Sequence, residues 1–287
     1  SDLNPGRTTV LFSIVTIHFN DLEGLRRTAD SIIGQTDQSS FEWIVIDGGS
    51  TDGSVDYLAS LDRIDILVSE KDAGIYDAMN KGLARSAGIY VWFMNAGDTL
   101  HRNDVVENLR KELSDDLGGD RVLQGILEGG TRVEGNEDGF PSLPDVIFGD
   151  TEFMDEAGTP VGLISKLKPQ PFPKRLHGGS FRFGMNICHQ SFLAKRALSP
   201  TFDLRYKQAA DVDWIIEILR RMRGRSFRST QVISNFELGG SSAQHTQKAW
   251  KERYLVLQKH YGWLPNLFAH GWILFRRLLF NLKLLGK

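Results

Sequence analysis

A carboxylate follows a glycine at the end of an apolar segment in the first third of the chain. Asp98 closes the sequence Asn95-Ala96-Gly97-Asp98, directly after the apolar segment 89–94. A carboxylate there can hold a divalent cation or lie beside a phosphate, because hard cations such as Mg²⁺ prefer oxygen ligands. The alternative is structural, since Asn and Asp also shape turns and cap helices. Taken alone, this turn favours the structural interpretation.

A second acidic residue stands at the end of another apolar segment. Asp47 follows residues 41–46 and opens a turn rich in Gly and Ser, 47–53. A carboxylate in this place can accept hydrogen bonds from a ribose hydroxyl or a base imide, and glycines such as Gly48 let the backbone approach a ligand. The alternative is a tight turn capped by Thr51 or Asp52. These turns contain no Gly-x-Gly-x-x-Gly or Walker pattern, which argues against dinucleotide and P-loop sites.

Two further carboxylates begin a predicted helix over 211–222. Asp211 and Asp213 would favourably complement the helix dipole there, which is the structural alternative to a catalytic role. Residues two apart on a helix point about 200° apart, so only one of them can face a given pocket as a general base. His189 and Gln190 lie in an apolar-flanked segment, where a histidine is usually structural. Phe19 either stacks on a nucleobase or packs in the core.

The elements that must position these residues are alternating strands and helices. Apolar segments 10–17, 41–46, 64–69 and 89–94 predict buried parallel strands, and helical patterns separate them. Such repeated units predict an α/β fold with a doubly wound, mostly parallel sheet that binds ligands at the carboxyl ends of its strands. All the polar turns fall at that edge. The Gly-, Asp- and Pro-rich composition of 114–143 predicts an exposed insertion.

Composition narrows the class of protein. Hydrophobic residues make up 41% and charged residues 24%, as in ordinary soluble domains, and the net charge of −2 offers no attraction to nucleic acid. The single cysteine, Cys188, excludes an intramolecular disulfide and a cysteine-based zinc site. No secretory leader and no run of about 18 apolar residues is visible, so we expect a cytoplasmic protein.

The end of the chain differs in charge from the rest. Residues 248–287 contain many Lys and Arg residues and one acid, Glu252. Residues 246–287 are therefore predicted to form a basic helical tail, of which 266–287 would lie on an anionic membrane surface. The alternative is a terminal helix that docks on the core or on a partner subunit. A projection at about 100° per residue groups one apolar arc: Leu267, Phe268, Trp272, Leu274, Phe275, Leu278, Leu279, Leu282 and Leu285.

The order of these pieces resembles the GT-A fold glycosyltransferases of family 2. The resemblance covers most of residues 10–245, and 45–53 with 74–80 is its most specific part. It implies one glycosyltransferase domain over 1–245, with a nucleotide-binding half at 10–100 and an acceptor half at 145–245. The matching stretches are 13–20, 44–53, 74–82, 95–98, 145–150, 188–190, 209–214 and 236–242.

The resemblance implies a nucleotide-diphosphate-sugar donor, with a UDP-sugar favoured. Asp98 corresponds to the last acidic position of the family's metal-binding Asp-x-Asp element, which implies Mn²⁺ or Mg²⁺. The first acidic position is Asn95 or Ala96 here, so one carboxylate remains and metal dependence is less certain. The residues carried over to the donor side are Thr16, Phe19, Asn20, Asp47, Gly48, Asp77, Asn80, Asn95 and Asp98.

The resemblance also implies an inverting reaction. Asp211 corresponds to the family's catalytic base, although Ala210 stands where many relatives carry Glu. Asp213 is the reserve candidate and lies on the acceptor side with His189 and Gln190. The acceptor would be a hydroxyl of a polysaccharide or lipid-linked glycan. Two alternatives remain open: a non-catalytic module that binds nucleotide sugars or glycans, and a nucleotidyltransferase, which would need a Gly-rich loop with Arg and Lys near the first strand.

Overall fold

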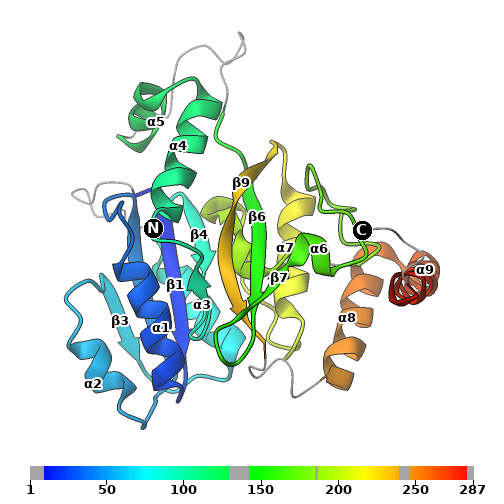
Figure 1. Ribbon diagram of the computed structural model, residues 1–287, viewed down its shortest axis with the longest axis horizontal. Coiled ribbons are helices and arrows are strands. Elements are labelled where there is room, and N and C mark those ends of the chain that lie inside the picture. Colours follow the sequence, from blue (N-terminus) through cyan, green and yellow to red (C-terminus); the bar gives the residue numbers. More distant parts are fainter. Residues whose placement is uncertain (1–9, 129–141, 185–186, 239–245, 283–287) are drawn as a thin grey trace.

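The described residues form one curled sheet of nine strands. The computed structural model describes residues 10–128, 142–184, 187–238 and 246–282. The strand order is β3-β2-β1-β4-β8-β6-β9-β5, and β7 pairs with β6 (Figure 1). The strands are β1 (Phe12–His18), β2 (Phe41–Asp47), β3 (Ile66–Ser69), β4 (Tyr90–Phe93), β5 (Thr99–Leu100), β6 (Val146–Met154), β7 (Pro160–Leu163), β8 (Phe192–Lys195) and β9 (Ser226–Glu237).

The first four strands form the parallel half of the sheet. β1 pairs in parallel with β2 and β4, and β2 pairs in parallel with β3. Every residue of β1, β2 and β4 is buried, as expected for strands covered on both faces. The register sets His18 opposite Asp47 and Asp47 opposite Ser69. The polar ends of these strands therefore meet at one edge.

The remaining strands form a mixed half that continues the sheet. β8 is antiparallel to both β4 and β6, whereas β6 and β9 are parallel. Predicted strand 145–149 is confirmed and extends to Met154. The helices are α1 (Leu22–Ile33), α2 (Ser54–Ala59), α3 (Ile75–Arg85), α4 (Val105–Leu117), α5 (Asp120–Leu127), α6 (Ile164–Leu167), α7 (Ala210–Arg221), α8 (Thr246–Tyr261) and α9 (Trp263–Asn281), with 3₁₀ turns at His189–Ser191 and Arg196–Leu198.

Helices cover both faces of the sheet. On one face, side chains of α3 and α7 pack with strand residues such as Val15 and Phe93 in one apolar core. A second core on the other face unites α1 and α4 with Ile14 and Trp92. Neighbouring residues of one strand thus point into different cores, as the pleat of a strand requires. The predicted doubly wound α/β fold is confirmed.

The predicted insertion at 114–143 is wrong over its first half. α4 continues to Leu117, and α5 follows after two glycines with positive φ, Gly118 and Gly119. Leu117 and Leu123 are buried in the second core. The glycines that suggested a loop instead end one helix and begin the next, because glycine readily adopts such dihedral angles. Residues 129–141 lie outside the described part of the chain.

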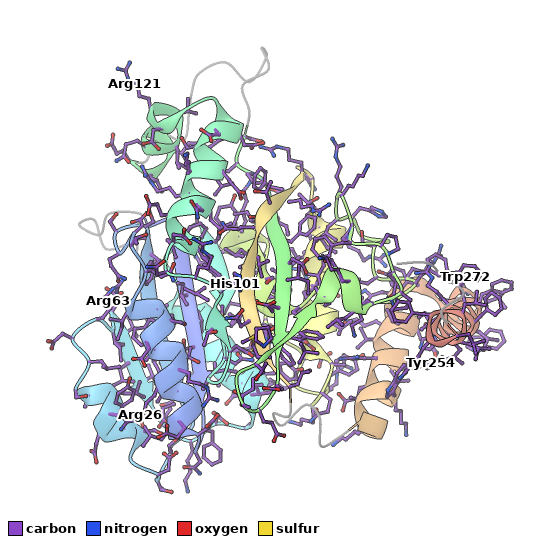
Figure 2. All side chains as sticks on the ribbon, in the orientation of Figure 1. Arg26, Arg63, His101, Arg121, Tyr254 and Trp272 are labelled. Atoms are coloured by element: carbon purple, nitrogen blue, oxygen red, sulfur yellow. The ribbon has the colours of Figure 1, made fainter. Side chains whose placement is uncertain are left out.

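The C-terminal helices differ from each other. α8 buries Val256 and Leu257 in the core of α7, so it belongs to the body of the domain and not to a separate tail. α9 lies beyond α8 at the edge of the molecule, and Figure 2 shows Trp272 on its outer side. Within the described residues, no helix has the length and apolarity to cross a membrane.

Candidate active site

Asp211 stands in the first turn of α7, where two side chains from other segments reach its carboxylate. The Tyr76 hydroxyl, from α3, donates a hydrogen bond of 3.1 Å to Oδ1. The Nδ1 atom of His189 lies 3.5 Å from Oδ2. The nucleotide-side helix α3 and the segment before β8 thus converge on one carboxylate of the C-terminal half. This is the arrangement that a positioned general base needs.

The surroundings of Asp211 favour its ionised form. Burial alone would raise the pKa of Asp211, because a low-dielectric environment disfavours charge. The hydrogen bond and charge of His189, together with the charge of Arg253 on α8, outweigh burial and hold the pKa of Asp211 below its usual value. The carboxylate is therefore ready to accept a proton at neutral pH.

His189 connects the base to the turn at Asn95. The Asn95 Nδ2 atom lies 3.1 Å from His189 Nε2. In the neutral ring, if the amide donates this bond, Nε2 carries no proton and the Nδ1 proton faces Asp211; in the charged ring both nitrogens carry protons. A chain of polar contacts therefore runs from Asn95 through His189 to Asp211, as the clustering of these predicted residues requires.

Asp98 is buried and has a neutral side chain as its hydrogen-bond donor. Gln190 Nε2 donates a 2.6 Å hydrogen bond to Asp98 Oδ2, and the carbonyl of Gln190 is held by the Trp92 indole at 2.7 Å. Only 6% of Asp98 is exposed. Burial raises the pKa of Asp98 to about 6, even though the Gln190 bond and the charge of His189 act in the opposite direction. An added positive charge would stabilise this carboxylate.

The atoms around Asp98 are of the kind that hold a hard divalent cation. Besides the carboxylate, Asn95 Oδ1 and Gln190 Oε1 are buried without a hydrogen-bond partner. Buried polar atoms normally have partners, so these two oxygens are candidates for contact with a ligand. Oxygen donors suit Mg²⁺ and Mn²⁺. The donor set fits a cation that takes its other ligands from a bound diphosphate.

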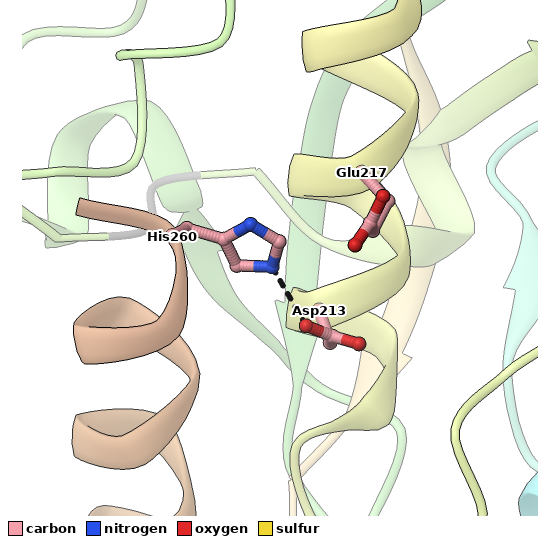
Figure 3. Close-up of side chains that lie close together, drawn as sticks. All are labelled: Asp213, Glu217 and His260. Carbon is pink, nitrogen blue, oxygen red and sulfur yellow. Dashed lines mark hydrogen bonds and ion pairs between the residues drawn. The ribbon is translucent and has the colours of Figure 1, made fainter. Parts of the chain in front are cut away.

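A second acidic cluster lies on the outer side of α7. Ligand atoms of Asp213, Glu217 and His260 lie within 4.8 Å of one another (Figure 3). However, Lys259 Nζ donates to both oxygens of Asp213 at 2.8 and 2.9 Å and lies 3.4 Å from Glu217. His260 Nε2 lies 2.7 Å from Asp213. The cluster is thus an ion pair between α7 and α8, with an ammonium group where a metal would sit.

The turn after β2 is a compact polar site. Asp47 Oδ2 accepts hydrogen bonds from the Ser69 hydroxyl at 2.7 Å and from the backbone of Gly49 and Ser50 at 3.1 Å. Burial opposes ionisation, but these bonds outweigh it and lower the pKa of Asp47. Its Oδ1 has no hydrogen-bond partner and lies 3.9 Å from His18 Nε2. The Asp47 side chain is buried, so this oxygen lies just beneath the edge and is not exposed at it.

Comparison with known proteins agrees with this geometry. A model described as glycosyl transferase family 2 matches residues 13–127. An uncharacterized glycosyltransferase of Mycobacterium tuberculosis is 44% identical over 103 residues, which are 36% of this chain and 39% of the relative's length. A PGL/p-HBAD biosynthesis glycosyltransferase of Mycobacterium bovis is 27% identical over 256 residues, 85% of this chain and 83% of that one.

Solved structures extend the likeness to most of the chain. TarS from S. aureus, in complex with UDP-GlcNAc, aligns with a TM-score of 0.58 at 12% identity, over 94% of this chain and 73% of that one. A mannosyltransferase from Pyrobaculum calidifontis, in complex with GDP-Man and Mn²⁺, aligns with a TM-score of 0.54 at 14% identity, over 97% and 76%. At these identities the likeness concerns the GT-A fold. Residues 13–127 thus match glycosyltransferase family 2, and most of the chain shares the fold of these structures.

Several residues predicted to bind the donor border the Asp47 turn. Phe19 is 61% exposed and lies over Gly48, where an added Cβ would come within 3.2 Å of the Phe19 ring and 2.6 Å of Asp72. Asn20 bridges the ends of β1 and β2, because its backbone donates to Ser50 and its side chain accepts from Thr51. Asp77 accepts from the Ala73 backbone at 3.0 Å.

Two side chains predicted on the donor side have structural partners instead. Thr16 is fully buried, and its hydroxyl accepts a 3.0 Å hydrogen bond from the Trp43 indole. Asn80 exchanges two hydrogen bonds with the backbone of Phe202, at 3.1 and 2.7 Å. The side chain of Thr16 joins β1 to β2, and that of Asn80 joins α3 to the acceptor half. We therefore remove both from the donor-binding set.

One acceptor-side prediction also changes. Asp213 points away from Asp211 into its pair with Lys259 and His260, which is expected for residues two apart on a helix. It is withdrawn as the reserve base. His189 and Gln190 instead belong to the centre of the site.

The sequence interpretation missed three contributors. Tyr76 lies inside the matched stretch 74–82, but an aromatic residue on an amphipathic helix is usually a core residue. Arg253 acts across a long stretch of sequence, with no local pattern to mark it. The backbone of Glu237, at the end of β9, donates a hydrogen bond to Asp98, and its side chain pairs with Arg27.

Proposed function

We propose that this protein is an inverting glycosyltransferase with Asp211 as its general base. An acceptor hydroxyl attacks the anomeric carbon of the donor sugar and transfers its proton to Asp211. The new bond between acceptor oxygen and carbon forms as the bond between carbon and diphosphate breaks, and the electron pair leaves with the diphosphate. One displacement inverts the configuration at that carbon. This chemistry requires an ionised base within reach of the donor site.

The observation that carries the proposal is the polar chain from Asn95 through His189 to Asp211. This chain of contacts connects the turn that bears Asp98 with Asp211, a carboxylate whose pKa is lowered. Tyr76 donates to the other oxygen of Asp211 and so limits its rotation. Asp213 is also held by two partners, so the contacts alone do not mark a base; what distinguishes Asp211 is that its contacts lead to the Asn95 turn.

The donor is proposed to be a nucleotide-diphosphate sugar, with a UDP-sugar favoured. The carboxylate of Asp47 would accept from the ribose or base, and the exposed ring of Phe19 would stack on the base. Asp98 and the nearby amide oxygens of Asn95 and Gln190 would hold Mn²⁺ or Mg²⁺ with the diphosphate. When bound, such a cation offsets the charge of the leaving group. The complexes of TarS with UDP-GlcNAc and of the mannosyltransferase with GDP-Man and Mn²⁺ support this choice.

The acceptor is proposed to be a hydroxyl of a polysaccharide or lipid-linked glycan. The chain would work in the cytoplasm, peripherally on the inner face of the membrane, with 266–287 on anionic lipid. The support is the excess of basic residues in the tail and the outward apolar side chains of α9. The relative named for PGL/p-HBAD biosynthesis agrees with a glycan product.

A panel of UDP- and GDP-sugars, with and without Mn²⁺ or Mg²⁺, tests the proposal. Binding is followed by calorimetry, nucleotide release by a coupled assay, and the anomeric configuration of the product by NMR. Asp98→Ala should weaken metal-dependent donor binding by at least about tenfold, because a metal-bound carboxylate contributes more than a neutral contact. Asp115→Ala, an exposed carboxylate on α4, is the matched control.

Three results would contradict the proposal. Binding of nucleotide sugars without any release would favour the non-catalytic module. Incorporation of a nucleotidyl group, with release of pyrophosphate, would favour a nucleotidyltransferase. Retention of the anomeric configuration would exclude the single displacement.

A further inference from the structure

One half of α9 presents apolar side chains to solvent. Phe268 is 82% exposed, and Asn266 and Ala269, on the opposite side, are buried. Projected at about 100° per residue, the exposed residues fill one half of the helix, with Arg276 and Arg277 just beyond its two edges. This orientation excludes docking of the arc on the body of the domain. The exposed apolar residues are Trp263, Leu264, Leu267, Phe268, Trp272, Leu274, Phe275, Leu278 and Leu282.

A second basic segment lies beside α9. Residues 157–202 contain no Asp or Glu, and neither do residues 253–287. The two segments meet in space, because the Tyr261 hydroxyl donates to the Gly178 carbonyl at 2.9 Å and Arg182 lies over the Tyr261 ring. Neighbouring segments without acids create a positive potential on this side of the molecule, although the net charge of the chain is −2.

A cleft of about 700 Å³ separates the 170–184 segment from α9. Lys174, Arg175, His177 and Arg276 line it, next to apolar Phe172 and Phe183. In the part of the chain that the structure describes, no carboxylate pairs with Lys174, Arg175 or Arg276 at salt-bridge distance; Arg276 instead lies over the Trp272 ring at 5.6 Å. The cleft thus combines unpaired cations with the edge of the apolar half of α9.

We propose that this cleft binds the phosphate of an anionic phospholipid while the apolar half of α9 enters the bilayer interface. Guanidinium and ammonium groups bind phosphate strongly, and aromatic side chains favour the interface depth at which such phosphates lie. Binding at two adjoining places fixes the orientation of the domain on the membrane. The inference deepens the proposed peripheral membrane location and rests on it.

Charge decides against a second copy of the chain as the occupant. Two copies that paired through α9 would bring two acid-free basic segments together, which costs free energy. A bilayer rich in anionic lipid offers the complementary charge and an apolar phase in one partner.

Sedimentation with vesicles tests the inference on the full chain. Phosphatidylcholine vesicles are compared with vesicles of equal parts phosphatidylcholine and phosphatidylglycerol. Each basic residue near an anionic surface contributes about fivefold to binding, so Lys174→Glu with Arg175→Glu should weaken binding to the anionic vesicles by at least about 25-fold. The matched control, Lys111→Glu with Arg121→Glu, reverses two exposed charges on α4 and α5, which lie away from α9 (Figure 1), and should change binding less than about twofold.

A second variant addresses the apolar half. Phe268→Ser with Phe275→Ser should weaken binding by about tenfold or more, because two aromatic rings no longer leave water. Sedimentation velocity on the same samples detects a second copy as the occupant. A dimer that this variant dissociates, with vesicle binding unchanged, would overturn the inference.

Two further results would also overturn it. One is equal loss of binding in the cleft variant and its control. The other is full displacement of the protein from vesicles by inorganic phosphate at constant ionic strength, which would indicate a site for free phosphate. Nucleotide release is measured in the same variants without vesicles and should stay unchanged. Failure of release in the parent protein would refute the transferase and leave the vesicle result intact.

Discussion

Asp98 and Asp211 lie on the two halves of the molecule and face opposite electrostatic conditions. Asp98, at the end of the parallel half, has neutral Gln190 as its hydrogen-bond donor, and burial raises its pKa to about 6. Asp211, in the acceptor half, has His189 and Arg253 near it, and its pKa is lowered. Burial penalises both carboxylates, and the charge of His189 favours both ionised forms. The difference therefore comes from the hydrogen bond of His189 and the charge of Arg253 at Asp211, and from the negative charge of Glu237 at Asp98.

The comparison teaches how one fold assigns two roles to the same side-chain type. A carboxylate that is destabilised when charged gains free energy when a cation arrives, which suits a metal ligand. A carboxylate that its surroundings already stabilise in the charged form stays ionised without a cation, as a general base must. The predictions below test this separation, and they are ordered by expected effect.

The largest effect is expected from Asp211→Asn. The amide cannot accept the proton of the acceptor, so kcat should fall by about 1,000-fold, within the usual range for a lost general base. Donor binding should stay within about twofold, because Asp211 is not proposed to touch the nucleotide. Single-turnover transfer and calorimetry measure the two quantities. Asp213→Asn is the control two residues away, and equal losses of kcat in both variants would disprove the assignment.

The next effect concerns the stability of the metal-free protein. A folded pKa of about 6 against a reference of 3.8 means that Asp98 disfavours folding once it ionises. The two-unit difference corresponds to at most about 3 kcal/mol. Below about pH 4 the unfolded and folded states are both protonated, so Asp98→Asn should match the parent there. As pH rises from about 4 to about 6, the parent should lose free energy of unfolding, and the loss should level off above about pH 6; the variant should show no such loss.

Denaturant titrations in EDTA from acidic to neutral pH measure this difference. Asp211→Asn provides the comparison with the opposite sign, because a lowered pKa means that ionisation of Asp211 stabilises the fold. That variant should therefore lose stability relative to the parent above the ordinary carboxylate pKa of about 4. If the free energy of unfolding changed with pH in the same way in both variants, the surroundings of Asp98 and Asp211 would not differ in their effect on ionisation.

The third effect isolates His189. Its hydrogen bond and charge are the main influences that lower the pKa of Asp211. His189→Gln should raise the pKa of Asp211, so the acidic limb of the profile of kcat/KM against pH should move to higher pH. At neutral pH we expect about a tenfold loss. Tyr76→Phe, which removes a neutral donor from the other oxygen, should move the limb less. If the acidic limb of the kcat/KM profile did not move in His189→Gln, His189 would not be the cause of the lowered pKa of Asp211.

The main strands and the edge where ligands bind could be predicted because buried parallel strands are continuous apolar runs. Residues 41–46 and 89–94 have this pattern, and the carboxylates that follow them therefore had to meet at one edge. That Asp211 lies near this edge of the sheet could be predicted only from the resemblance to family 2. No local pattern shows that α3 and the segment before β8 converge on the start of α7.

Side-chain direction and long-range contacts account for the errors. Thr16 and Asn80 have suitable chemistry, but their hydrogen bonds to Trp43 and Phe202 are formed by folding and leave no mark in the sequence. Glycines such as Gly118 and Gly119 occur both in loops and at junctions between helices, so composition alone does not distinguish the two. Arg253 affects Asp211 only because α8 packs against α7.

The smallest effect tests how α8 holds α7. Lys259→Met removes the ammonium between Asp213 and Glu217 but keeps most of the apolar length of the side chain. Asp213 keeps His260, so the free energy of unfolding should fall by only about 1 kcal/mol. Lys251→Met, an exposed position on the same helix without an ion pair in the described residues, is the matched control and should change nothing measurable. Equal stability of both variants in urea titrations would show that the pair contributes nothing, and that Asp213 differs from Asp211 only in its direction on the helix.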